Sequence, residues 1–268
     1  FNRIIHFKRS VVGMNLEMVG GFDQTNLLIS IALVMILIIV SRIRKILNES
    51  GTWAAAVLGL GVAIGGHWTW LVTLLAFLSA GFFVTRWRYE EKRERGFNEG
   101  EDGERDWTNV LSNGGVPLLI SLYAFATEDW QGLLPIFVAS VAVASSDTFA
   151  SEVGCLDKRV YMITTMKKCE PGLNGGFSPN GQMAALAGAL LISLVATGLG
   201  MVVGAEATLS QIEFIFSITL IGFLGCQVDS LLGALFENRG YIGKGTVNTL
   251  AIATGALITC YFYPIVVF

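Results

Sequence analysis

Long apolar runs separated by short polar segments dominate the chain from residue 27 onward. A transmembrane α-helix needs about 20 mostly apolar residues, and most of these runs approach that length. The pattern therefore predicts an all-α polytopic membrane protein, a bundle of about seven or eight transmembrane helices. The runs are Leu27–Val40, Trp53–Ile64, Trp68–Val84, Val110–Ala126, Trp130–Ala144, Met183–Val203, Ile212–Phe236 and Val247–Phe268.

The runs set the expected domain organisation. We expect residues 24–268 to form a single transmembrane domain and residues 1–23 to form an N-terminal tail or interfacial segment. Polar loops are expected at about residues 86–107, 155–180 and 237–246. The run Trp53–Ile64 is short enough to be tilted or partly re-entrant, and we expect it to form a helical hairpin with the next run.

Composition agrees with a membrane protein. The 268 residues are 53% hydrophobic and 15% charged, which is far more apolar than a soluble domain of this size. The net charge of −3 gives no basic excess for binding nucleic acid. The four cysteines lack the close spacing of a zinc site, and two of them fall in apolar runs, so the sequence indicates neither a metal site of this kind nor a disulfide framework.

The positions of the basic residues predict the orientation in the membrane. Apart from three in the N-terminal tail, every Lys and Arg follows the first, third, fifth or seventh run. The alternate loops carry Glu128, Asp129 and Glu206 instead. Loops rich in Lys and Arg stay on the cytoplasmic side of a membrane. The basic loops are therefore expected at the cytoplasmic (or stromal) face, and both termini on the other side.

Two carboxylates stand near the cytoplasmic ends of the fifth and seventh runs. Asp147 precedes Thr148, and Asp229 precedes Ser230. An ionisable residue in a membrane span is costly and is usually functional, and carboxylate oxygens are ligands that Mg²⁺ prefers. Glu152 follows Asp147 closely, and two interpretations stay open for it: a further ligand or a solvated residue at the helix end.

Glycine-rich segments open the fourth, sixth and eighth runs at the same face. They are Asn113–Gly115, Asn174–Gly176 and Gly243–Gly245, and Asn248 follows the last of them. Backbone N–H groups at a helix N-terminus attract anions, and glycine lets a phosphate approach closely. Together with the carboxylates and neighbouring lysines these segments predict a magnesium–nucleotide phosphate centre, with packing or capping as the alternative. A shared centre requires Asp147 and Asp229 to lie within about 10 Å, since paired metal ions sit about 4 Å apart.

Four segments resemble one integral-membrane family, which includes plant phytyl-phosphate kinase and transmembrane protein 19. The resemblance covers most of the chain, from the first run to the last. The matching segments are Arg105-x-Trp107-x-x-Val110-Leu111-x-Asn113-Gly114-Gly115, Asp147-Thr-x-Ala-Ser-Glu152-x-Gly154, Pro171-Gly-x-Asn174-Gly175-Gly176-x-Ser178 and Gly222-x-x-Gly225-x-x-x-Asp229-Ser230-x-x-Gly233-Ala234.

The resemblance implies transfer of a nucleotide's terminal phosphate, with CTP as donor, to an isoprenoid monophosphate such as phytyl or geranylgeranyl phosphate. We expect Asp147, Asp229 and Glu152 to hold Mg²⁺ and to serve catalysis. The isoprenoid tail would lie in an apolar groove between helices, among membrane lipids, and the sequence leaves homo-oligomer formation open. The residues expected to bind the nucleotide or its phosphates are Asn113, Lys167, Lys168, Asn174, Gly175, Gly176, Ser178, Lys244 and Asn248.

Two other functions remain alternatives. A CTP-dependent lipid alcohol kinase or a cytidylyltransferase would use a carboxylate as a base, for which Glu152 or Asp229 could serve. A lipid-phosphate transporter with broken helices would bind its substrate near the bilayer midplane, whereas the polar groups here cluster near one face. Transport is therefore the poorer fit.

Overall fold

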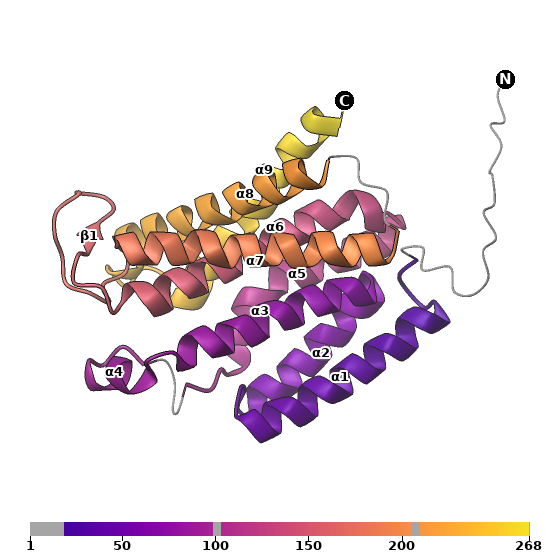
Figure 1. The fold of residues 1–268 in the computed structure, drawn as a ribbon, viewed down its shortest axis with the longest axis horizontal. Helices are drawn as coiled ribbons and strands as arrows, with labels where there is room; N and C mark the ends of the chain where they lie inside the picture. Colours follow the sequence, from indigo (N-terminus) through magenta and orange to yellow (C-terminus); the bar gives the residue numbers. More distant parts are fainter. Residues whose placement is uncertain (1–18, 99–102, 205–209, 268) are drawn as a thin grey trace.

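The computed structural model describes residues 19–98, 103–204 and 210–267, and these ranges form a helical bundle (Figure 1). The predicted tail therefore lies mostly outside the described residues. The long helices are α1 (Gln24–Arg44), α2 (Glu49–Gly65), α3 (Trp68–Arg86), α5 (Trp107–Thr127), α6 (Trp130–Gly154), α7 (Pro179–Val202), α8 (Gln211–Leu232) and α9 (Lys244–Val267).

The predicted fold class is confirmed. Seven helices in the described ranges are long and apolar enough to cross a membrane, namely all of the long helices except α2. The 17 residues of α2 are at the lower end of the length that spans a bilayer. This helix is continuous and starts four residues before the predicted run, because the Asn48 side chain accepts a hydrogen bond from Gly51 N and caps it.

Helix α6 is the centre of the bundle. Ten consecutive residues, 137–146, are buried all the way around it, as expected of a helix surrounded by other helices. The helices α3, α5, α7, α8 and α9 pack against it. Small residues permit this close approach: Ser145 and Ser146 donate hydrogen bonds of 2.9 Å to the Gly188 and Ala185 carbonyl oxygens of α7. The end of α6 therefore continues directly from the most buried segment of this helix.

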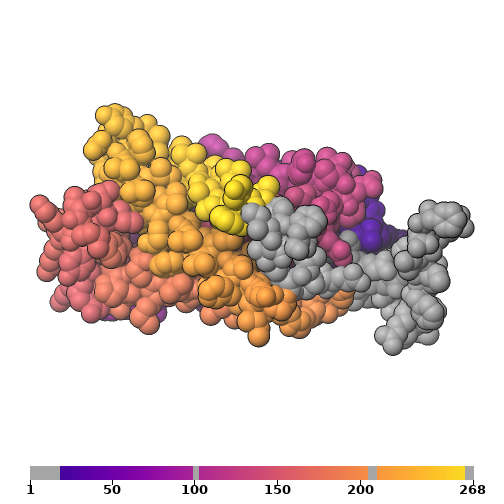
Figure 2. All heavy atoms as spheres, turned by 90° about the horizontal axis from the view of Figure 1, so that it is seen from above, coloured from indigo at the N-terminus to yellow at the C-terminus, as the bar shows by residue number. Residues whose placement is uncertain are grey.

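Short elements gather at one end of the bundle. The helix α4 (Tyr89–Glu94) follows α3, and the strands β1 (Tyr161–Met162) and β2 (Gly176–Phe177) form an antiparallel hairpin between α6 and α7. A π-helical turn, η1 (Gly233–Glu237), continues α8. The hairpin segment and the start of α9 form one end in the space-filling view, in red and gold at the left of Figure 2. The polar loops predicted between the runs thus carry local structure of their own.

Candidate active site

Close packing of α8 on α6 brings the two aspartates together. A Cβ at Gly222 would lie 2.8 Å from the Ala189 Cβ and 3.0 Å from the Ala142 Cβ, and a Cβ at Gly225 would lie 2.4 Å from Val143. Only glycine lets the two backbones approach this far. One turn beyond Gly225, Asp229 meets Asp147 of α6.

Asp147 and Asp229 form what we call the carboxylate pair. Their side chains approach within hydrogen-bonding distance of one another, which meets the distance that a shared centre requires. Asp229 Oδ2 is buried and has no hydrogen-bond partner among the described residues. A buried carboxylate oxygen without a partner is costly, so the pair is arranged for a proton or a cation that completes it.

The π-helical turn adds Glu237 to the surroundings of the carboxylate pair. Residues eight positions apart on a regular α-helix are about 80° apart around its axis, because each residue turns the chain by about 100°. The wider turn η1 is marked by the bond from Asn238 N to Gly233 O, and it rotates the chain less per residue. Glu237 is thereby brought back toward the face of Asp229 and acts electrostatically on both aspartates.

The predicted Asn174–Gly176 segment packs directly on this turn. Gly175 has φ +80°, and a Cβ there would lie 2.4 Å from the Ala234 Cβ and 2.7 Å from the Ser230 carbonyl oxygen. The Asn174 side chain interacts with Glu237, and the backbone carbonyl oxygen of Asn174 accepts a 2.8 Å hydrogen bond from the Asn238 side chain. Glycine is required at position 175 both for the backbone conformation and for the contact.

A cavity of about 300 Å³ opens at this end of the bundle, with the carboxylate pair in its wall. It brings together most of the residues that the sequence predicted. Asn113, Lys167 and Lys168 do not line it: Asn113 borders a small apolar cavity between α2, α3 and α5, and both lysines are exposed on the hairpin segment. The predicted residues that do line the large cavity are Asp147, Glu152, Asn174, Gly175, Gly176, Ser178, Asp229, Lys244 and Asn248.

Glu152 has partners other than the carboxylate pair. Its Oε2 lies 2.5 Å from Lys92 Nζ, and its Oε1 accepts a 2.8 Å hydrogen bond from Thr85. Lys92 is only 1% exposed and also donates a 3.0 Å bond to the Val84 carbonyl oxygen. The structure therefore ties α4 to the end of α6 through Glu152 and does not bring this residue to the pair as a third ligand.

Arg105 lies beside this buried ion pair. Its guanidinium packs over the Phe77 ring at 5.7 Å and fills the space that a side chain at position 81 would need. Burial lowers the pKa of Arg105, and the nearby Glu152 carboxylate opposes that shift. The dense charge of residues 86–107 is typical of a polar loop, and no local pattern there predicts that Lys92 is buried or that Arg105 is partly buried.

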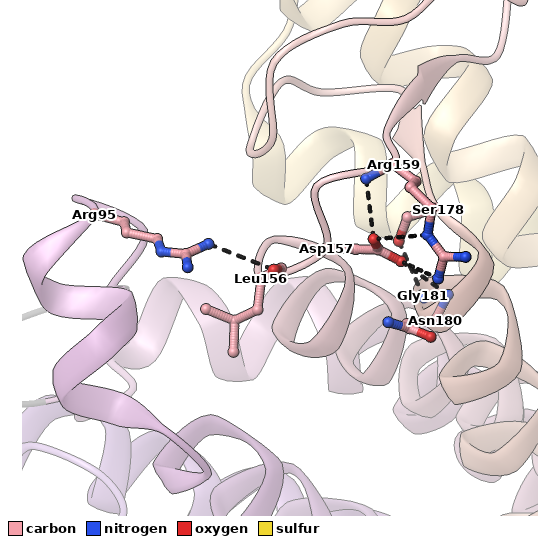
Figure 3. A network of polar contacts seen from close by, with 7 residues as sticks. All are labelled: Arg95, Leu156, Asp157, Arg159, Ser178, Asn180 and Gly181. Carbon is pink, nitrogen blue, oxygen red and sulfur yellow. Dashed lines mark hydrogen bonds and ion pairs between the residues drawn. The ribbon is translucent and has the colours of Figure 1, made fainter.

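The N-terminus of α7 is capped by protein groups (Figure 3). Gly181 N donates a 3.1 Å hydrogen bond to Ser178 Oγ, and Asn180 N donates a 3.3 Å bond to Asp157 Oδ2. Burial acts to raise the pKa of the Asp157 carboxyl, but hydrogen bonds from Arg159 and Asn180 outweigh it and hold that pKa below its ordinary value. Ser178 thus lines the cavity as a helix cap, while α9 contributes Lys244 and Asn248 from its first turns.

The donor set fits a cation that prefers oxygen ligands, provided that a substrate shares it. Among the described residues, no three His, Cys, Asp or Glu side chains are placed to hold a metal ion by themselves. Mg²⁺ is usually bound by only one or two carboxylates together with substrate phosphates and water. The carboxylate pair, with its unpartnered Asp229 oxygen, meets that requirement.

Sequence comparison relates this geometry to known proteins. An uncharacterized membrane protein of Methanocaldococcus jannaschii is 30% identical over 238 residues, which are 88% of this chain and 94% of that protein. Protein PGR of Arabidopsis thaliana is 27% identical over 215 residues, 74% of each chain. Protein VTE6, chloroplastic, also of Arabidopsis thaliana, is 26% identical over 220 residues, 79% of this chain and 64% of that protein. No solved structure matches.

The family itself is defined by a match that covers most of the chain. Residues 32–256 match the family described as integral membrane protein DUF92, and this range includes α2 to α8 and both members of the carboxylate pair. The resemblance indicated by the four sequence segments is confirmed at this level. This chain belongs to the integral membrane protein DUF92 family.

Proposed function

We propose that this protein is a membrane-embedded kinase that transfers the terminal phosphate of a nucleotide, with CTP as donor, to an isoprenoid monophosphate. The product is the isoprenoid diphosphate. The observation that carries the proposal is the carboxylate pair, with its unpartnered oxygen, in the wall of a cavity that Lys244 and Asn248 also line. The family relationship supports the proposal, because the four sequence segments resemble the family that includes plant phytyl-phosphate kinase.

Each group has a role that phosphoryl transfer needs. Asp147 and Asp229 would hold Mg²⁺, which neutralises and orients the phosphate oxygens when it is bound. Lys244 and the first turn of α9 attract phosphate charge, and Asn174 and Asn248 offer side-chain amides to orient it. The acceptor is already an anion, so the reaction needs positioning and charge stabilisation more than it needs a base.

We assign the end of the helical bundle that contains the cavity to the cytoplasmic or stromal side of the membrane. The basic segments that follow α1, α3, α6 and α8 lie at this end of the bundle, which agrees with the positive-inside rule. A water-soluble nucleotide would enter the cavity from that side. The acceptor would reach it from the membrane, with its phosphate at the surface and its tail in the hydrocarbon.

The test is a transfer assay with purified protein in nanodiscs, geranylgeranyl monophosphate and CTP labelled at the α or γ phosphate. We expect only the γ label to enter the lipid, as diphosphate. Asp147→Asn or Asp229→Asn should lower turnover about a hundredfold or more, since each removes charge at the transferring group. Asp129→Asn, at the exposed opposite end of α6, is the matched control. Near-normal turnover in either site variant contradicts the assignment.

A lipid alcohol kinase or cytidylyltransferase is the second candidate, and Glu237 is the observation that favours it. An alcohol acceptor must lose its proton, and Glu237 lies beside the carboxylate pair where a base would be needed. The same assay separates the reactions. Transfer to geranylgeraniol would show an alcohol kinase, and entry of the α label into lipid would show cytidylyl transfer.

A further inference from the structure

A second, apolar cavity lies along the seam between α8 and α9. Its volume is about 240 Å³. We call it the α8–α9 groove. The residues that line it are Pro135 of α6, Phe214, Phe216, Ser217, Ile218, Leu220, Ile221 and Leu224 of α8, and Ile258, Thr259 and Phe262 of α9.

We call the cavity of about 300 Å³ that contains the carboxylate pair the polar cavity; it and the groove both include residues of α8 and α9, at different depths. The polar cavity takes Asp229 and Ser230 from the end of α8 and Lys244 and Asn248 from the start of α9. Leu224 is five residues before Asp229, which is about 7.5 Å along the helix. The groove therefore starts about one and a half helical turns from the carboxylate pair and leads away from it.

The dimensions of the groove suit one hydrocarbon chain. From Leu224 to Phe214 it follows α8 for about 15 Å, half of the roughly 30 Å hydrocarbon core of a bilayer. Pockets that enclose a whole drug-sized ligand measure about 300 to 1,000 Å³, so this groove holds a single chain rather than two. Leu220 and Phe216 are 43% and 68% exposed, which leaves the groove open on its lipid side.

We infer that the α8–α9 groove binds the hydrocarbon tail of the phosphorylated acceptor while its phosphate lies at the polar cavity. The inference rests on the proposed function, because the acceptor is a single-chain lipid phosphate. A chain that runs down this seam is placed with its charged end at the carboxylate pair. Lys244, and a cation that Asp147 and Asp229 would hold, would supply the positive charge for the phosphate, and the groove would exclude water from the tail. The groove would thus set the preference for chain length.

A binding experiment tests the location without requiring turnover. A geranylgeranyl monophosphate with a photoreactive diazirine at the far end of its tail is added to the full-length protein in nanodiscs, without nucleotide, and irradiated. We expect cross-links in peptides that contain residues 214–224 or 258–262, and competition by unlabelled geranylgeranyl monophosphate but not by geranylgeraniol. Cross-links spread over all lipid-facing helices would overturn the inference, since ordinary membrane lipid would then fill the groove.

A matched pair of substitutions tests specificity. Leu224→Trp fills the groove, and Leu194→Trp places the same bulk on α7; the two leucines are 42% and 49% exposed. Blocking contact with about two methylene groups should raise KM for geranylgeranyl monophosphate about tenfold in Leu224→Trp. KM for CTP, which does not enter the groove, should change little. Equal effects of both substitutions on KM would also overturn the inference.

The two proposals fail in different ways. If tail cross-links fall in the groove but no phosphate is transferred, the groove assignment stands and the kinase proposal fails. If γ-phosphate is transferred but the tail cross-links to other helices, the kinase proposal stands and the groove assignment fails.

Discussion

The buried ion pair between Lys92 and Glu152 makes the sharpest prediction about stability. Lys92→Met removes the cation and leaves the Glu152 carboxylate 9% exposed, with the Thr85 hydroxyl as its remaining hydrogen-bond donor. Breaking a buried pair from one side costs about 3 to 5 kcal/mol, because the remaining charge is uncompensated. Arg105 lies close enough to compensate part of that charge, so we expect the lower end, about 3 kcal/mol.

The measurement is thermal unfolding in detergent, followed by tryptophan fluorescence. A loss of about 3 kcal/mol in a chain of this size corresponds to a decrease in Tm of roughly 6 to 12 °C. The control is Arg42→Met, which breaks the ion pair with Glu49, whose side chains are 52% and 77% exposed. An exposed pair contributes less than about 1 kcal/mol, so this variant should unfold near the wild-type temperature.

A double variant decides whether the charges themselves are responsible. In Lys92→Met/Glu152→Gln no charge of the pair remains, and we expect much of the lost Tm to return. The Mg²⁺ concentration for half-maximal activity should be affected equally by Lys92→Met and Glu152→Gln, since both loosen the same contact. If the double variant is as unstable as the sum of the single ones, or if only Glu152→Gln alters the Mg²⁺ dependence, the reasoning is refuted and Glu152 acts on the metal.

Three further predictions concern the backbone and pH. Gly175→Ala should lower stability and turnover far more than Gly240→Ala, because both glycines have positive φ but only the first would contact Ala234 and the Ser230 carbonyl oxygen; equal unfolding temperatures would contradict this. Asp157→Ala removes the acceptor of the Asn180 N hydrogen bond and should lower the free energy of unfolding by about 1 kcal/mol at neutral pH. Because the pKa of Asp157 in the folded protein is below its ordinary value, this difference between wild type and variant should disappear only in acid, when the wild-type carboxylate is protonated. Burial lowers the pKa of His67 from 6.5 to about 4, although Asp23 opposes the shift, so stability should decline as pH falls from 6.5 toward 4. In unfolding measurements over that range, His67→Gln should show a smaller decline; an equal decline would show that another group is responsible.

The membrane fold was predictable from the sequence because it depends on the length of apolar runs and the placement of charge. Each predicted run corresponds to a helix, and the shared centre of Asp147 and Asp229 was predicted from their similar depth near the ends of two runs that cross the membrane in the same direction. Physical terms that act along the chain, such as hydropathy and charge asymmetry, determine these features.

Features that depend on contacts between distant segments could not be predicted in this way. The burial of Lys92 results from a partner 60 residues away, and a Lys in a charged loop has no local sign of such a partner. Asn113 was assigned to phosphate binding because its Asn-Gly-Gly sequence matches Asn174–Gly176, yet only the second segment borders the polar cavity. The same tripeptide leads into strand β2 of the hairpin in one place and lies inside α5 in the other, so its role depends on context that spacing does not reveal.

The direction in which Glu237 points is set by the backbone of the π-helical turn η1 and not by any single side chain. Because the turn accommodates an additional residue within the height of the helix, the direction of Glu237 depends on how many residues separate it from Asp229. Deleting one residue between them would restore regular geometry and still leave Glu237 on the face of Asp229, because seven residues at about 100° each bring the chain to within about 20° of two full turns. A substitution that straightened the turn without shortening the chain would instead move Glu237 about 80° away from that face, so the backbone conformation of η1 is itself a functional feature of the chain.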